Sequence, residues 1–300
     1  MDHTEIRAGR PFLIPPCISD VEPFMTSIRR ELHANPELSF KEHATASRIA
    51  CILREMPGIS HIAEGVGRTG VTAMIFGGAG KGPCILLRAD MDALPLQETG
   101  DLPFKSKNEG VMHACGHDGH CAALLGAARV LAAERENMFG SIKLCFQPAE
   151  EGFGGARFMI ADGILEMSAD VGGEGPTPKV DEVYGAHLWT YEPLGTVGAR
   201  AGPMMAGSDR FEVTVTGRGG HGAAPQSTVD AIVVASHVIT ALQTVVSRSI
   251  DPLEPAVVSC CQVHGGSGYN IISDSVKIGG TARHFSLKTQ AVIESRMVRI

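Results

Sequence analysis

The sequence lacks several features that would place the chain outside the soluble globular enzymes. No stretch approaches the roughly 18 apolar residues of a membrane span. The apolar run Pro11–Cys17 is short and broken by three prolines, so we expect no secretory leader. Lys and Arg are scattered, the formal net charge is −7 and the pI is near 5.9, which argues against nucleic-acid or anionic-membrane partners. The eight cysteines include no C-x-x-C pair, as expected for reduced thiols in a cytoplasmic protein.

Length and patterning together predict two domains. The 300 residues exceed a comfortable single core, and 44% of them are hydrophobic with a mean hydropathy of +0.07. In residues 1–194, apolar strands alternate with helical patterns, which predicts a layered α/β domain with a mixed sheet, helices on both faces and ligand-bearing loops at strand ends. Helices are expected over 21–32, 41–56, 118–134 and 155–161, and strands over 71–76, 84–88, 141–146 and 183–187.

The pattern changes from residue 195 onward. Phe211, Val213 and Val215 alternate with polar neighbours, as in a half-exposed antiparallel strand. An apolar stripe at helical spacing then covers 231–246. Strands over 256–263 and 276–283 and a helix from about residue 288 complete a β-α-β-β-α order. We therefore predict a separate small α+β domain, ferredoxin-like, over residues 195–300.

The segment His113–His120 reads HACGHDGH and carries three imidazoles, a thiol and a carboxylate. In a core, each ring nitrogen and the thiol would need a partner, whereas a divalent metal satisfies several of them at once. The spacing Cys115-x-His117 is too tight for one face of a regular helix. It favours a loop at a strand end that wraps a metal.

Two later segments supply further metal-binding groups. Gln147–Gly152 (QPAEEG) places adjacent carboxylates in a turn, and Gly185–Trp189 (GAHLW) places a histidine after a short apolar run, with Trp189 as a packing residue. Thiolate, imidazole and carboxylate together favour zinc, with manganese, cobalt and nickel as competitors. Adjacent glutamates on an extended segment point to opposite sides. One can then bind metal while the other carries a proton, as a metallohydrolase requires.

Several motifs in the same order make the chain resemble the M20 family of metallopeptidases and amidohydrolases. The resemblance covers about residues 21–300 and is strongest to hippurate hydrolases, N-acyl-amino-acid amidohydrolases and plant auxin-conjugate hydrolases. The motifs are ELHANPELSFKEHATA (31–46), LLRADMDALPLQE (86–98), HACGHDGH, FQPAEEG and GRGGHGAAP (217–225).

The resemblance implies a pair of divalent metal ions held by Cys115, His117, Glu151 and His187. It also implies that Glu150 is the general base. On its own, His187 would more often be a core histidine, so its role as a ligand rests on the resemblance.

The resemblance further assigns the second domain as a lid that mediates homodimerisation. It implies that His221 reaches the neighbouring subunit's site to stabilise the substrate's carbonyl oxygen. Asn270 and Arg283 match positions that hold a substrate carboxylate. The alternative for these two is a turn asparagine and a strand-end surface arginine.

Four further residues are expected to support the ligands rather than to bind metal. Asp90 and Asp92 are expected to hydrogen-bond strand-end amides or His117. His120 and Asp118 are expected to fix imidazole orientation, and a helix N-cap is an equal role for Asp118.

The sequence therefore predicts a cytoplasmic two-metal amidohydrolase that cleaves N-acyl-amino acids, hippurate-like, to a carboxylic acid and a free amino acid. The alternatives are a dipeptidase or aminopeptidase of the same superfamily and a non-catalytic remnant. The chain stops at Ile300 inside an amphipathic pattern. The segment that in the family returns from the lid, with a last metal-binding histidine, is expected to be missing, so we expect a fragment or an incomplete catalytic domain.

Overall fold

The computed structural model describes residues 21–168 and 175–300. The chain divides into two compact units, one ending at Pro193 and the other spanning Leu194–Ile300, next to the domain boundary that the sequence predicts.

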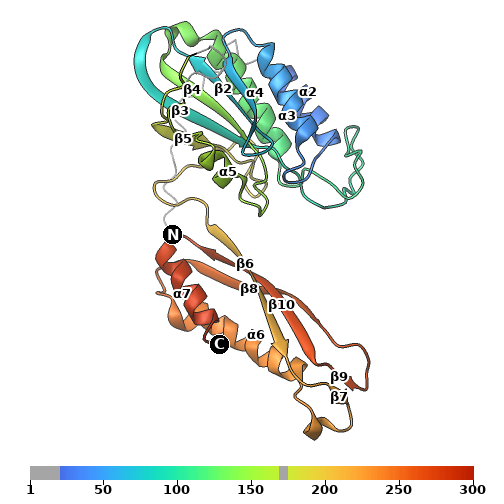
Figure 1. Cartoon of the computed structure of the whole chain (residues 1–300). Helices are drawn as coiled ribbons and strands as arrows, with labels where there is room; N and C mark the ends of the chain where they lie inside the picture. Colours follow the sequence, from blue (N-terminus) through green and yellow to red (C-terminus); the bar gives the residue numbers. More distant parts are fainter. Residues whose placement is uncertain (1–20, 169–174) are drawn as a thin grey trace. The chain divides into compact units, whose positions relative to one another are not determined.

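The first unit is built on one five-stranded mixed sheet (Figure 1). Its strand order is β1-β2-β4-β3-β5; β3 runs parallel to β4 and β5, and β2 runs antiparallel to β1 and β4. The mixed α/β architecture is as predicted. The strands are β1 (Ser60–Val66), β2 (Gly70–Phe76), β3 (Gly80–Asp90), β4 (Phe139–Gln147) and β5 (Glu182–Gly185).

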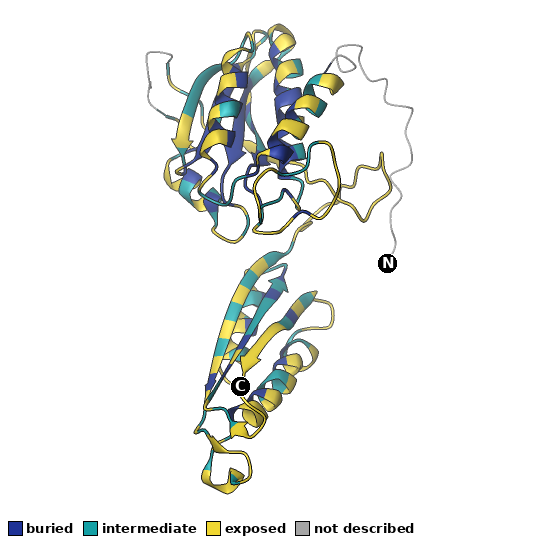
Figure 2. Ribbon diagram, turned by 90° about the vertical axis from the view of Figure 1, so that its right-hand side faces the viewer, coloured by how far each residue is buried: buried dark blue, intermediate teal, exposed yellow. Residues whose placement is uncertain are grey.

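Helices cover both faces of this sheet. The alternation of side chains along β4 sends Leu144 and Phe146 into the core under α2, α3 and α4. Cys145 faces the opposite side, where it packs with Met159 of α5. The buried faces of the first three helices line this core (Figure 2). The helices are α2 (Glu22–Ala34), α3 (His43–Arg54), α4 (His117–Ala133), the short η1 (Arg135–Asn137) and α5 (Gly155–Ala161).

Three strand ends meet at one edge of the sheet. Asp90 of β3 pairs with Gln147 of β4, and Arg88 pairs with Gly185 of β5. Because these strands are parallel, the segments that follow them begin side by side. HACGHDGH does not directly follow a strand, contrary to the prediction that it forms a loop at a strand end. Residues 91–112 separate it from β3, and its last four residues open α4 instead.

The second unit is a three-stranded antiparallel sheet with two helices. β10 (Ser275–His284) lies between β6 (Gly207–Thr216) and β8 (Ala256–Gly265). A two-stranded ribbon pairs β7 (Gly220–His221) with β9 (Ile271–Ile272), and η2 covers Pro225–Ser227. The helices are α6 (Ala231–Ser249) and α7 (Leu287–Met297).

Among the described residues, α6 is long and apolar enough to cross a membrane by length and composition, contrary to the expectation that no segment approaches such a span. Ala231 and Ala235 are buried in a cluster with Val276 and Ile278 of β10. Leu242 is buried further along the helix. One face of α6 therefore packs against the sheet, while Ile232, Val233 and Val234 on the rest of the helix are exposed.

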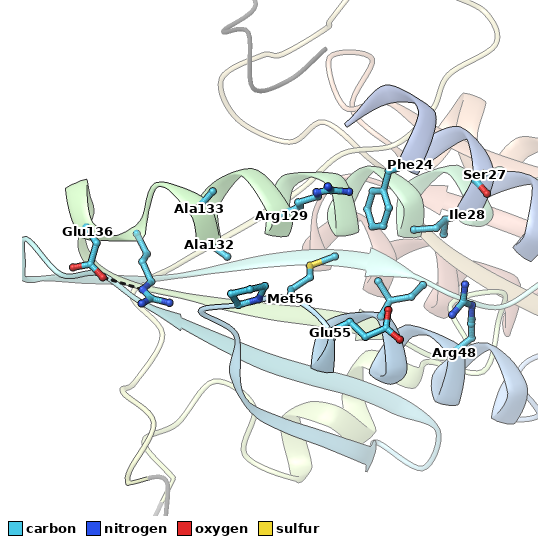
Figure 3. A pocket seen from close by; sticks show the side chains of 13 residues that line it. Phe24, Ser27, Ile28, Arg48, Glu55, Met56, Arg129, Ala132, Ala133 and Glu136 are labelled. Carbon is cyan, nitrogen blue, oxygen red and sulfur yellow. Dashed lines mark hydrogen bonds and ion pairs between the residues drawn. The ribbon is translucent and has the colours of Figure 1, made fainter. Parts of the chain in front are cut away.

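A hollow of about 680 Å³ lies between α2, α3 and the end of α4 (Figure 3). Phe24, Arg48 and Arg129 contribute to its wall, and the Arg129 guanidinium lies 5.0 Å from the centre of the Phe24 ring. None of the candidate metal ligands lines it.

Candidate metal centre

The predicted ligands from three separate segments lie together in the first unit. Donor atoms of Cys115, His117 and His187 all lie within 4.8 Å of one another, and so do those of His117, Glu150 and Glu151. Cys115 Sγ is 3.4 Å from His187 Nε2. His117 belongs to both groups, so it stands at the centre of the site.

The two histidines bind a backbone carbonyl through the same ring atom, Nδ1. His117 Nδ1 lies 2.8 Å from the backbone carbonyl of Asp92, and His187 Nδ1 lies 2.6 Å from that of Leu188. A carbonyl only accepts, so each Nδ1 carries a proton and donates it. His117 Nε2 is buried and has no hydrogen-bond partner among the described residues. A metal-binding histidine has the same arrangement, with one nitrogen donating to a carbonyl and the other left for the metal.

The surrounding charges favour a cation at this point. Burial lowers the pKa of His117, but the neighbouring Asp92, the Cys115 sulfur and the charge of Asp90 outweigh burial and raise the pKa to about 11. His117 Nε2 lies 3.5 Å from Asp90 Oδ2 and 3.9 Å from Glu151 Oε1. Without a metal, a proton on His117 therefore supplies positive charge among these acids. The donor set and its charge fit a divalent metal ion.

Asp90 and His120 form a relay behind the ligands. His120 Nδ1 lies 2.6 Å from Asp90 Oδ1, and the backbone N–H of Leu188 donates to His120 Nε2 at 2.8 Å. Because an amide N–H can only donate, Nε2 accepts and Nδ1 donates to Asp90. Both ring nitrogens are thus engaged, and His120 holds the backbone beside His187. This geometry supports the orienting role expected for His120.

Asp90 stays ionised despite its position. Burial raises its pKa, but the hydrogen bond from His120 and the charges of His117 and Arg88 hold the pKa well below its usual range. The Arg88 guanidinium lies 2.9 Å from Asp90 Oδ2. Asp90 therefore brings a permanent negative charge to within reach of His117.

Asp92 connects the histidine to the glutamate turn. Its two carboxylate oxygens accept the backbone N–H groups of Glu150 and Glu151, each at 3.0 Å, and its own carbonyl accepts His117 Nδ1. Burial raises the pKa of Asp92, but the hydrogen bonds from His117, Ser39 and these two amides lower it overall.

The two glutamates do not diverge as the sequence suggested. Glu150 and Glu151 lie in a turn after β4 rather than on an extended strand. Both carboxylates therefore reach the ring of His117. Burial and the charges of Glu151 and Asp90 raise the pKa of Glu150. A carboxylate that holds a proton more readily than usual is suited to general base and acid chemistry.

The N-cap alternative for Asp118 is wrong. The N-cap of α4 is Gly116, in the left-handed conformation, and Asp118 lies within the first turn. Asp118 Oδ2 instead accepts from Arg29 Nε and from His33 Nδ1, both at 2.8 Å. Asp118 does orient an imidazole, but it is that of His33.

The sequence reasoning gave His33 no function, yet His33 lies at the centre of a buried network. Its Nε2 lies 3.2 Å from Glu98 Oε1, and the backbone N–H of Ser106 donates to Glu98 Oε2 at 2.7 Å. The network joins α2, the start of α4 and the connecting segment 91–116. Histidine in a helical pattern gives no signal of such partners, which come from remote segments.

His113 and Trp189 also differ from expectation. Both ring nitrogens of His113 are buried and have no partner among the described residues, and burial lowers the pKa of His113 to about 4. Trp189 is half exposed rather than packed, and its ring stands edge-on to His187 at 5.5 Å.

Comparison with known proteins identifies the family. Residues 86–293 match the model of peptidase family M20/M25/M40. The chain belongs to this family. It is 43% identical to an IAA-amino acid hydrolase of Arabidopsis thaliana over 94% of the chain and 60% of the relative. It is 42% identical to the N-acyl-L-amino acid amidohydrolase of Geobacillus stearothermophilus over 94% of the chain and 73% of the relative.

The fold of this M20 chain matches solved structures of the family. A Bacillus subtilis protein described as a dinuclear metal binding peptidase from the M20 family superposes with a TM-score of 0.71 at 36% identity, over 94% of the chain and 69% of that structure. The chain spans about 60% of the length of the plant hydrolase.

The lid residues of the M20 pattern lie in the second unit and are not together. His221 and Asn270 line one hollow of about 540 Å³ at the β7–β9 ribbon. Arg283 lies at the opposite end of β10, eight residues after Ser275, a span of roughly 26 Å for an extended strand. Arg283 Nη1 donates to the carbonyl of Ala282 at 3.0 Å. One copy of the second unit therefore does not bring Asn270 and Arg283 to the same small carboxylate.

Proposed function

We propose that this chain acts as a metal-dependent amidohydrolase that cleaves N-acyl-amino acids to a carboxylic acid and a free amino acid. The observation that carries the proposal is the pair of histidines, His117 and His187, which bind backbone carbonyls through Nδ1 and lie in a cluster with the Cys115 sulfur and two carboxylates. Relatives named for N-acyl-amino acids and IAA-amino acids support this substrate class. The bond common to these names is an amide between an acyl group and an amino acid.

Cys115, His117, Glu151 and His187 would hold the metal ions, and the structural relative described as dinuclear supports two of them. Zinc, manganese, cobalt and nickel all suit this donor set. A bound divalent metal would lower the pKa of a water molecule and polarise the amide carbonyl.

Glu150 would move the proton. Its carboxylate takes a proton from the attacking water and returns it to the departing amine nitrogen. The raised pKa of Glu150 makes it a better proton acceptor than an ordinary surface glutamate. Asp92 holds the backbone N–H of Glu150, so the carboxylate is kept beside His117 without being a ligand itself.

The lid residues would recognise the rest of the substrate. An arginine fork such as that of Arg283 suits a carboxylate, and His221 would stabilise the carbonyl oxygen. Because Asn270 lies at the β7–β9 ribbon and Arg283 lies at the far end of β10, their joint use on one substrate requires a second copy of the chain. We therefore propose a homodimer through the second unit.

The test compares Glu150→Gln with Glu151→Gln after loading with zinc, manganese or cobalt. Glu150→Gln should keep its metal content and lose turnover of N-acetyl- and N-benzoyl-amino acids by about 10² to 10⁴-fold. Glu151→Gln should lose metal as well. Hydrolysis by Glu150→Gln at the wild-type rate would show that Glu150 is not the base. Absence of hydrolysis across the whole panel by the metal-loaded chain would refute the proposed activity.

A further inference from the structure

Glu42 is a fully buried carboxylate that stands just before α3. Glu42 occupies the N-cap position, but its side chain makes no capping hydrogen bond. Glu37 makes such bonds instead, since its oxygens accept the backbone N–H of Ala44 at 3.1 Å and that of Thr45 at 2.8 Å. The carboxylate of Glu42 is thus free to serve another element.

The two oxygens of Glu42 bind neutral groups from remote segments. Oε1 accepts the backbone N–H of Ala149 at 2.9 Å, and Oε2 accepts the hydroxyl of Thr69 at 2.6 Å. Glu42 forms no ion pair among the described residues. Burying a carboxylate without a cation costs several kcal/mol in general. A neutral side chain of similar shape would avoid that cost. The groups that Glu42 binds therefore indicate why this position holds a carboxylate.

Ala149 is the residue directly before the glutamate pair. It is fully buried and has φ of +50°, a left-handed conformation that costs an alanine about 1–2 kcal/mol. Three successive backbone N–H groups, those of Ala149, Glu150 and Glu151, are each bound by a buried carboxylate. Asp92 holds the second and third, and Glu42 holds the first. The turn is therefore fixed from two sides.

The segments that lead to Glu42 and Thr69 also contain non-glycine residues with a positive φ. Phe40 and Arg68 have φ of +60° and +85°, and they precede Glu42 and Thr69 respectively. The Arg68 guanidinium lies over the rings of both Phe40 and Phe158, at 4.4 and 4.2 Å from their centres. Glu42 and Ala149 are both fully buried, and away from water a hydrogen bond to a charged acceptor is stronger.

We propose that Glu42 is a positioning residue for Glu150 and Glu151, a role that rests on the function proposed above. By holding the Ala149 amide, Glu42 keeps the strained turn in place and directs both carboxylates toward His117. Glu42 touches neither substrate nor metal. Removing the Glu42 carboxylate should therefore lower metal affinity and turnover in a protein that still folds.

The experiment compares Glu42→Ala with Glu37→Ala, which loses contacts at the same helix start but leaves the Ala149 amide bound. Co²⁺ affinity is measured by calorimetry, backbone exchange of the peptide around Ala149 by mass spectrometry, and stability by thermal melting. Glu42→Ala should bind Co²⁺ about 10- to 100-fold more weakly than Glu37→Ala, with faster exchange at Ala149. Glu42→Gln keeps an acceptor for the amide, so its Co²⁺ affinity should fall between those of wild type and Glu42→Ala.

Equal Co²⁺ affinity and equal exchange in Glu42→Ala and Glu37→Ala would overturn the proposal. If Glu42→Ala does not fold, Glu42→Gln decides, and unchanged affinity and exchange in that variant would overturn it. Neither readout needs hydrolysis. If Glu42→Ala binds Co²⁺ more weakly but the wild-type chain has no activity, the positioning role stands and the proposed function is refuted. If the wild-type chain is active and Glu42→Ala binds Co²⁺ equally well, the proposed function stands and the positioning role is refuted.

Discussion

Replacing His120 by leucine should separate the support of the site from its ligands. His120 donates to Asp90 at 2.6 Å and accepts the Leu188 amide at 2.8 Å. Leucine can do neither, so Asp90, which is 1% exposed, loses its shortest hydrogen bond. A hydrogen bond to a charged group contributes about 1.5–3 kcal/mol. The free energy of unfolding should fall by about that amount in His120→Leu, and the backbone beside His187 should loosen.

The matched control lies in the same motif. His113 is 4% exposed against 5% for His120, but its ring nitrogens have no partners among the described residues. An unsatisfied buried polar group costs about 1–3 kcal/mol, so His113→Leu should be neutral or stabilising.

Urea unfolding and Zn²⁺ titration of both variants test this reasoning. Zn²⁺ affinity should fall about 10- to 100-fold in His120→Leu and stay near the wild-type value in His113→Leu. Equal losses in the two variants, or wild-type affinity in His120→Leu, would refute the relay from Asp90 to Leu188.

Three further predictions follow from the same structure. Cys115→Ala should contain less bound metal than wild type by elemental analysis. Cys121→Ala should not, because the Cys121 thiol donates to the Asp90 carbonyl at 3.1 Å. Equal metal content in Cys115→Ala and wild type would show that Cys115 is not a ligand. Burial raises the pKa of Glu98, but the Ser106 amide and His33 outweigh burial and lower it below 4.5. Glu98 thus stabilises the fold above its unfolded pKa, and this stabilisation is lost as the pH falls through its folded pKa. In Glu98→Gln, the free energy of unfolding measured in urea should therefore depend less on pH below about 4.5. An unchanged dependence on pH would contradict this. Light scattering at micromolar concentration should show a dimer, and a monomer would count against the second unit as the dimer contact.

Periodicity was enough for most of the fold. The apolar runs of β2 and β4 and the stripe of α6 are long and regular, and the structure has these elements at the predicted places. β1 was missed because its sequence, SHIAEGV, is polar and lies at a sheet edge. The β7–β9 ribbon was missed because two-residue strands carry no period.

The sequence pointed to the metal-binding cluster and to support from Asp90, Asp92 and His120, but not to Glu42 and His33. Cys115 and His117 stand in one dense motif whose chemistry is visible in the sequence. Glu42 and His33 stand among ordinary helical residues, and their partners, such as Ala149 and Glu98, are 107 and 65 residues away. Only the folded chain brings these groups together, so no local pattern marks them.

The start of α4 sets an electrical constraint on the site. His117 is the first residue of the helix, and the aligned peptide dipoles place roughly half a positive elementary charge at that end. This field repels a cation and attracts an anion. Asp118 in the first turn and the buried Asp90 and Asp92 place negative charge beside this end of the helix and oppose its field. Replacing these aspartates by asparagine would therefore remove the charges that offset the helix dipole and weaken the hold of the site on a divalent metal.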